Sequence, residues 1–295
     1  MSRTAVALAQ ILGFPLFELE RISREPKLLH YRYERRLIGK KTRLLRIPLG
    51  PLRQILDAIK TRILDSMPLP PTMHGWRKRR SPKTYAKAHV RHSCLINVDI
   101  QDFFPSVDGG RVHSFWMRAG FTTEAAKLLT ALTVCDNQLP QGSPTSQAIG
   151  NQVLVHLDRR LNRLSNLNGL SFGMYGDEFT LSGRRRLKRL KPLTIRIVNQ
   201  EGFNVNPTKV KDPDRSERQE IAGIFVNKKP SLGRDHYKKL RAILYNCVRF
   251  GPESQNRECH PNFMGHLRGH IGHMIQVNPK LGYQLLESFN KIGWN

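Results

Sequence analysis

The feature that most constrains the fold of this chain is a pair of adjacent acids between two strand-like runs. Residues 170–183 have the sequence LSFGMYGDEFTLSG, in which apolar and aromatic residues flank a short polar centre. Gly176 and Asp177 suit the positive backbone angles that tight hairpin turns require. The stretch therefore predicts two antiparallel strands with Asp177 and Glu178 at the tip of their hairpin.

A third acid, Asp99, lies in a segment with the alternation of a β-strand. Apolar and polar residues alternate along INVDI, residues 96–100, which is typical of a strand with one buried face. If this strand lies beside the hairpin in one sheet, Asp99 comes close to Asp177 and Glu178. Three neighbouring carboxylates raise one another's pKa unless a counter-charge is present. Mg²⁺ prefers such hard oxygen ligands, although turn chemistry alone also favours Asp at a hairpin tip.

The charge of the chain indicates a polyanionic partner. Its 295 residues include 49 Lys and Arg and 23 Asp and Glu, which gives a net charge of +26. A surplus of this size repels itself in a compact protein, so we expect nucleic acid as the partner. No apolar run reaches the roughly 18 residues of a transmembrane helix. The N-terminal segment lacks a clear signal-peptide cleavage site, so we expect a cytoplasmic protein without a membrane partner.

The order of the expected elements indicates an α+β fold instead of a regular βαβ alternation. The first ninety residues are basic and have helical apolar spacing, most clearly at residues 52–64. After them we expect a strand at 93–100, helices at 110–120, 123–137 and 147–164, the hairpin, a helix at 190–203, a strand at 219–227 and a helical tail from about 234.

Three segments resemble, in order and spacing, the palm motifs of reverse transcriptases, and of bacterial retron reverse transcriptases in particular. They are INVDIQDFFPSV (96–107), LPQGSPTSQAIGNQVLVHLDRRL (139–161) and MYGDEFTLS (174–182). Flanking segments resemble the retron fingers motifs (41–56 and 74–90), the strand before the thumb (220–227) and the thumb (266–286). The resemblance extends from about residue 30 to the end of the sequence.

The resemblance implies a right-hand polymerase fold with helical fingers, an antiparallel-sheet palm and a helical thumb. The corresponding ranges are 1–92 for the fingers, 93–230 for the palm with a fingers insertion near 108–138, and 231–295 for the thumb. It also implies an RNA-directed DNA polymerase that copies a structured non-coding RNA from dNTPs. Priming from an RNA 2′-hydroxyl would give an RNA–DNA hybrid, the msDNA, and family context suggests antiphage defence with a separate effector protein. The oligomeric state is left open.

The resemblance assigns catalytic roles to the acids identified above. Asp99, Asp177 and Glu178 match the catalytic acids, and with the Ile100 carbonyl they would hold two Mg²⁺ ions, or Mn²⁺. The family's hairpin motif is normally Tyr-Ala-Asp-Asp, whereas residues 175–178 are Tyr-Gly-Asp-Glu. Because Glu keeps the charge and adds one methylene, we expect an active enzyme that is slower or shifted toward Mn²⁺.

Six further residues match nucleotide-binding positions of the family. Phe104 corresponds to the aromatic residue that excludes a ribose 2′-hydroxyl by its bulk. Gln141 and Gly142 match the loop along the incoming nucleotide, where glycine allows close backbone approach. The remaining matches are basic: Arg43 and Lys41 would neutralise the triphosphate, and Lys209 would protonate the leaving pyrophosphate.

Two basic regions are expected to contact the nucleic-acid backbone. These nucleic-acid-binding candidates are Arg77, Lys78, Arg79 and Arg80 in the fingers and His266, Arg268 and Lys280 in the thumb. His266 and His270 are four residues apart, a spacing that also suits a zinc site on a helix. A backbone-gripping helix is the preferred interpretation of this segment.

Three other functions remain as alternatives. A related defence reverse transcriptase would synthesise DNA without conventional templating. A catalytically weakened RNA-binding scaffold would account for the altered hairpin, and a metal-dependent nuclease would use the same acids. Primer extension and sequencing of the product distinguish all three from templated synthesis.

Overall fold

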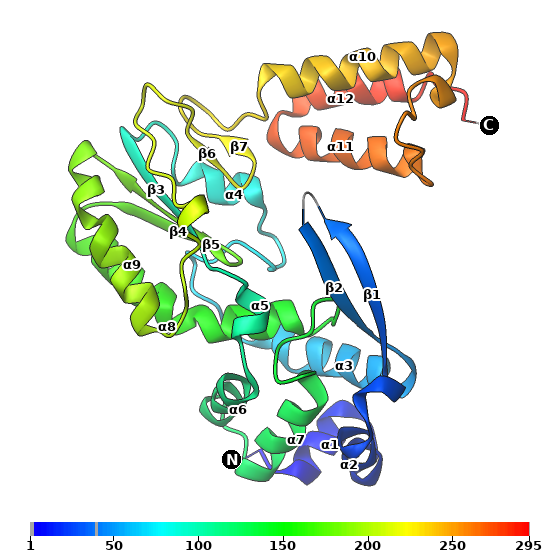
Figure 1. Ribbon diagram of the computed structural model, residues 1–295, viewed down its shortest axis with the longest axis vertical. Helices are drawn as coiled ribbons and strands as arrows, with labels where there is room; N and C mark the ends of the chain where they lie inside the picture. The colour runs from blue at the N-terminus through cyan, green and yellow to red at the C-terminus, as the bar shows by residue number, and fades with distance from the viewer. Residues whose placement is uncertain (1–2, 39–40, 295) are drawn as a thin grey trace.

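The computed structural model describes residues 3–38 and 41–294, and the side chains of Ile38 and Lys41 lie outside the described part. The chain forms a mixed α and β structure in which a three-stranded sheet lies between an N-terminal helical part and three C-terminal helices (Figure 1). None of the helices in these residue ranges is long and apolar enough to cross a lipid bilayer.

The central sheet contains the strand and the hairpin predicted from the sequence. Strands β3 (Cys94–Asp99), β4 (Ser171–Tyr175) and β5 (Glu178–Gly183) are antiparallel and lie in the order β3-β5-β4. The condition for bringing Asp99 close to the hairpin acids, that its strand lies beside the hairpin in one sheet, is therefore met. In this register Asp99 lies directly opposite Glu178.

The two faces of the sheet differ as the alternation predicts. Val98 pairs with Phe179 on the apolar face, and both are fully buried in the main core. This core also includes residues of α8 (Ser146–Leu167). On the polar face, Thr180 hydrogen-bonds the side chains of Asn97 and Tyr85, the latter from α4 (Pro82–Lys87). The catalytic candidates belong to this polar face and its edge.

A group of helices from the first half of the chain packs with the sheet. It comprises α1 (Ala5–Leu12), α2 (Leu16–Arg24), α3 (Gly50–Arg62), α5 (Phe103–Ser106), α6 (Gly109–Arg118) and α7 (Thr123–Thr133). Their buried residues join those of the sheet in one continuous core. The expected helix over residues 52–64 and the two helices after residue 109 are confirmed.

One part of the N-terminal region differs from its helical prediction. Strands β1 (Tyr31–Ile38) and β2 (Lys41–Pro48) form an antiparallel hairpin that extends toward the C-terminal helices (Figure 1). The helical prediction for this segment is wrong, because Tyr31 and Tyr33 alternate with charged residues at the period of a strand. Because this exposed hairpin carries many basic residues, its alternation is not visible in the hydrophobicity pattern of the sequence.

The chain after the central hairpin contains a helix, two short strands and several turns. Helix α9 (Lys191–Gln200) ends before Gly202, as predicted. The single strand predicted at 219–227 is instead a small hairpin of β6 (Glu220–Ile221) and β7 (Ile224–Phe225). Its turn contains Ala222 and Gly223 at φ 43° and φ 74°, and those left-handed angles interrupt the strand.

Three helices form the C-terminal part: α10 (Arg234–Phe250), α11 (Phe263–Val277) and α12 (Pro279–Phe289). They enclose a separate core that includes Leu244, Ile271 and Leu285. The proposed division into fingers, palm and thumb at 92/93 and 230/231 stays a prediction. Short 3₁₀ helices connect the larger elements at Lys27–Leu29, Leu64–Ser66, Arg185–Leu190, Pro207–Lys209 and Pro252–Ser254.

Candidate active site

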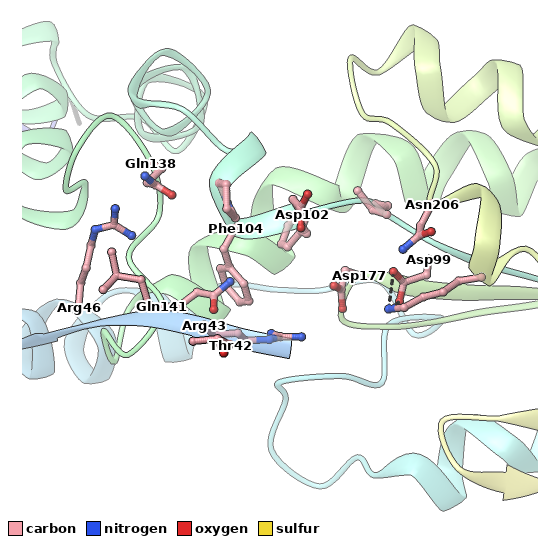
Figure 2. Close-up of a pocket in the computed structure, with 15 residues that line it drawn as sticks. Thr42, Arg43, Arg46, Asp99, Asp102, Phe104, Gln138, Gln141, Asp177 and Asn206 are labelled. Atoms are coloured by element: carbon pink, nitrogen blue, oxygen red, sulfur yellow. Dashed lines mark hydrogen bonds and ion pairs between the residues drawn. The ribbon is translucent and has the colours of Figure 1, made fainter. Parts of the chain in front are cut away.

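A cavity of about 530 Å³ lies where β2, the end of β3, α5 and the turn of the central hairpin meet (Figure 2). Seven of the residues selected from the sequence line it, and they come from segments far apart in the chain. These seven are Arg43, Asp99, Ile100, Phe104, Gln141, Asp177 and Lys209.

Asp99 and Asp177 are brought together by the pairing of β3 with the hairpin. The Ile100 N–H donates to the Asp177 carbonyl at 3.0 Å, which continues the ladder past the end of β3. Gly176 has φ 65°, so it takes the left-handed position of the turn just before Asp177. Both aspartates line the cavity, and Figure 2 shows their side chains on the same side of it.

The environment of Asp177 disfavours its ionised form. Burial raises the pKa of this carboxyl, and the negative charge of Asp99 raises it further. Lys209 and Arg43 act in the opposite direction without reversing the shift. An additional cation in the cavity would therefore stabilise Asp177 as a carboxylate.

Lys209 already occupies the place of such a cation beside Asp99. Its ammonium donates to both carboxylate oxygens of Asp99, at 2.9 Å and 2.8 Å. A cation that bridges two oxygens of one carboxylate shows that the site accepts positive charge there. Two carboxylates suit Mg²⁺, which completes its shell with water and substrate phosphate. Among the described residues, no three His, Cys, Asp or Glu side chains are already arranged as a metal site.

Glu178 is not brought into the cavity with the two aspartates. Its Oε1 accepts a hydrogen bond of 3.0 Å from the Ala222 N–H in the β6–β7 turn. Burial raises the pKa of Glu178, and the charges of Asp99 and Asp177 contribute to the rise. Glu178 is thus electrostatically coupled to the pair, while its direct role as a metal ligand stays a prediction.

Phe104 lies between the two aspartates and Gln141 in Figure 2. Its ring is partly buried, and its neighbours are Phe103 and Trp76, with ring centroids 5.4 Å and 5.2 Å away. Asp102, immediately before α5, has φ 43°. This left-handed residue turns the chain sharply between β3 and α5 and brings the aromatic ring to the cavity.

The loop with Gln141 and Gly142 is attached to β2. The Arg46 N–H donates to the Gln141 carbonyl at 2.7 Å, and Gln141 lines the cavity. Gly142 does not line it. A Cβ at Gly142 would lie 3.1 Å from the Arg46 carbonyl oxygen, and its φ is 110°. This glycine therefore permits the close approach of the loop to the strand.

Arg43 and Lys41 belong to β2, which forms one wall of the cavity. Arg43 is exposed and lines the cavity. The side chain of Lys41 lies outside the described part of the structure, so its predicted contact with the triphosphate stays a prediction.

The cavity also contains residues that were not selected from the sequence. Asn206 is the most informative of them, because its N–H donates to the Asp99 carbonyl at 2.9 Å. Its side chain caps the short helix that carries Lys209, and the Asn-Pro-Thr sequence at 206–208 is the signal that could have identified it. The other residues are Thr42, Leu44, Arg46, Asp102, Phe103, Pro105 and Gln138.

The basic segment 77–80 does not line this cavity. Arg77 donates to the Pro70 carbonyl at 2.8 Å, and Lys78 forms an ion pair of 2.8 Å with Asp65. Arg79 and Arg80 are exposed. Their contact with nucleic acid stays a prediction.

The thumb candidates lie in α11 and α12, outside the cavity. His266 lies between His260 and His270, with ring centroids 4.7 Å away on each side. No group of three or more potential ligands in the described residues has the arrangement of a metal site. Arg268 lies over the Phe289 ring, and Lys280 is exposed.

Comparison with known proteins gives matches over most of the chain. A family model described as reverse transcriptase (RNA-dependent DNA polymerase) matches residues 38–218. Retron Mx65 reverse transcriptase of Myxococcus xanthus is 32% identical over 263 residues, which is 82% of this chain and 60% of that protein. Retron Ec86 reverse transcriptase of Escherichia coli is 26% identical over 266 residues, which is 89% of this chain and 80% of that protein.

A solved structure extends the likeness to the fold. Telomerase from Candida albicans, solved in complex with a TWJ fragment of telomeric RNA, has a TM-score of 0.51 and 9% sequence identity. The match covers 92% of this chain and 64% of the telomerase chain. At that identity the likeness concerns the fold alone.

Proposed function

The chain belongs to the reverse transcriptase family, with a polymerase fold and retron enzymes among its relatives, and on this basis we propose that it is an RNA-directed DNA polymerase. The observation that carries the proposal is that Asp99 and Asp177 line the same cavity, which Arg43 and Phe104 also line. The chain spans about 60% of the length of the Mx65 relative and 80% of the Ec86 relative.

The proposed reaction is attack by a primer hydroxyl on the α-phosphate of a dNTP, with release of pyrophosphate. Asp99 and Asp177, with the Ile100 carbonyl, would hold the divalent cations. Two Mg²⁺ ions, or Mn²⁺, would activate the attacking oxygen and neutralise charge on the leaving group. Glu178 contributes negative charge next to this pair, and its coupling to both aspartates supports that role.

Other cavity residues would bind and orient the nucleotide. Arg43 offers its guanidinium to the triphosphate, and the position of Gln141 supports a contact with the nucleotide. The ring of Phe104 would lie under the sugar and exclude a 2′-hydroxyl by its bulk. Lys209 would leave Asp99 when cations bind and supply a proton to the leaving pyrophosphate.

The retron relatives support a more specific role. We infer a structured non-coding RNA as the template, a 2′-hydroxyl of RNA as the primer, and an RNA–DNA hybrid as the product. We also propose antiphage defence with a separate effector protein. The net charge of +26 is compatible with the RNA partner.

The test is extension of a labelled primer on an RNA template of known sequence, with each dNTP omitted in turn. Templated synthesis predicts that extension stops where the omitted nucleotide is required. Extension that ignores the template would favour untemplated synthesis, and shortening of the primer would favour a nuclease. Binding of RNA without any change in primer length would favour a scaffold.

A further inference from the structure

The segment from Thr72 to Trp76 lies alongside the central hairpin. The His74 N–H donates to the Met174 carbonyl at 2.7 Å, and the Met174 N–H donates to the Thr72 carbonyl at 2.9 Å. These two bonds give the outer strand β4 an additional neighbour. The two bonds therefore fix the register of this segment relative to β4, and the segment continues to the turn that carries Asp177.

At the turn, the two backbones are in direct contact. A Cβ at Gly75 would collide with the backbone nitrogen of Gly176. A Cβ at Gly176 would lie 2.7 Å from Cζ2 of Trp76, which is too close for a side chain. The Trp76 ring therefore covers the residue that precedes Asp177, and only glycine fits beneath it.

The same ring also contacts the aromatic residues on α5. Its centroid is 5.2 Å from that of Phe104 and 6.0 Å from that of Phe103. Gly150 of α8 leaves room for this group, since a Cβ there would lie 2.9 Å from Phe103 and 3.5 Å from Trp76. Trp76 thus lies between the turn that carries Asp177 and the ring that lines the cavity.

The backbone at Trp76 is held in an unfavourable conformation. Its φ is 52°, and a bulky residue rarely adopts this left-handed region unless its surroundings impose it. The Asn151 side chain, which is 2% exposed, donates to the carbonyls of Gly75 at 3.0 Å and Trp76 at 3.4 Å. The buried Asn151 amide therefore holds the backbone that carries the indole ring.

We propose that Trp76 is a positioning residue that sets the separation between the Asp177 turn and Phe104, and thereby the discrimination between deoxyribonucleotides and ribonucleotides. This inference rests on the proposed polymerase function. Phe104 excludes a 2′-hydroxyl only if its ring stays at a fixed distance from the site of reaction. Trp76 contacts both structures that define this distance.

The experiment compares Trp76→Leu and Trp76→Phe with the native chain. The readout is the ratio of kcat/KM for a dNTP to kcat/KM for the matching ribonucleotide. We expect the ratio to fall roughly tenfold in Trp76→Leu, on the scale of other changes in pocket shape. The smaller loss of volume in Trp76→Phe gives a fall of roughly threefold on the same scale.

Trp116→Phe is the matched control, because Trp116 is fully buried in α6 and packs against Phe115 and Phe121 outside the cavity. This variant should lower the melting temperature and leave the ratio unchanged. If both Trp76 variants lower the two kcat/KM values in parallel, the ratio stays constant and Trp76 is only a structural residue. If Trp76→Leu does not fold, the ratio in Trp76→Phe decides by itself.

A failure of the proposed polymerase function gives a different experimental result from a failure of the positioning role. A native chain that incorporates neither nucleotide overturns the proposed function and the positioning role together. A native chain that discriminates, beside a Trp76→Phe variant that discriminates equally well, overturns the positioning role alone.

Discussion

The ammonium of Lys209 bridges the two carboxylate oxygens of Asp99, at 2.9 Å and 2.8 Å. The two residues are 110 positions apart in the sequence. The charge of the Asp99 carboxylate is therefore balanced by a cation of the protein itself. A divalent cation that binds Asp99 must therefore compete with Lys209.

The first prediction is that Lys209→Met binds Mn²⁺ more tightly than the native chain. The Lys209 side chain is 48% exposed, so the ion pair is worth at most about 1 kcal/mol and the gain in affinity is roughly fivefold or less. Isothermal titration with Mn²⁺ measures it without any turnover. Lys211→Met, an exposed neighbour, should leave the affinity unchanged. Equal or weaker binding by Lys209→Met would contradict the competition.

The second prediction concerns the unequal roles of Asp177 and Glu178. Glu178→Gln keeps the length and the oxygen that accepts from Ala222 but removes the charge. We expect it to lower incorporation by roughly tenfold, less than the hundredfold or more expected when a principal electrostatic group is removed, as in Asp177→Asn. Single-turnover extension with Mg²⁺ and with Mn²⁺ provides the comparison. Equal losses in the two variants would instead make Glu178 a full partner of the aspartates.

The third prediction is that Phe104→Ala admits ribonucleotides. Removal of the ring opens the cavity where the sugar would lie, so incorporation of a ribonucleotide should rise relative to the matching dNTP by roughly tenfold or more. Competition between the two nucleotides in one extension reaction measures the change. Trp116→Phe is the control, because Trp116 is fully buried in α6 and packs against Phe115 and Phe121 outside the cavity. An unchanged preference in Phe104→Ala would remove the steric role.

The fourth prediction concerns stability and pH. Burial raises the pKa of Asp158 from 3.8 to about 6, and its Oδ1 accepts from the Thr72 hydroxyl at 2.6 Å. Because the folded pKa is the higher one, the fold favours the protonated acid. This contribution is fully present below about pH 4 and is lost as the pH rises through about 6.

Asp158→Asn removes the titration and should be more stable than the native chain at pH 8, by on the order of 2 kcal/mol. The difference should shrink as the pH falls toward 4. Urea unfolding across this pH range measures it. Asp57→Asn serves as a control for loss of an acid at the surface, because the Asp57 side chain is 47% exposed. A difference that does not depend on pH would show that Asp158 does not titrate as described.

The sequence predicted the parts of the site that depend on local alternation. The alternation at residues 96–100 identified the strand with Asp99, and the turn residues Gly176 and Asp177 identified the hairpin. The β1–β2 hairpin was missed because it is largely exposed and basic, and little apolar alternation marks it. Local pattern also gave no indication that Glu178 would reach Ala222, since that contact requires the fold of a segment 44 residues away.

The role of Trp76 illustrates a second limit of sequence patterns. An aromatic residue in a basic loop predicts a contact with nucleic acid as readily as a packed ring. Only the three-dimensional arrangement shows that Gly75 and Gly176 touch and that the ring reaches Phe104. The glycine at position 176 then has a steric reason, which the order of residues alone did not supply.

The most direct test of the account is templated extension by the native chain beside Asp177→Asn, on an RNA template with dNTPs and Mg²⁺ or Mn²⁺. Asp57→Asn in α3, where the side chain is 47% exposed, controls for the loss of one acid. The account predicts a DNA product complementary to the template from the native chain and the control, and a product reduced at least about a hundredfold in Asp177→Asn. Equal synthesis by all three proteins, or none by the native chain with either metal, would contradict it.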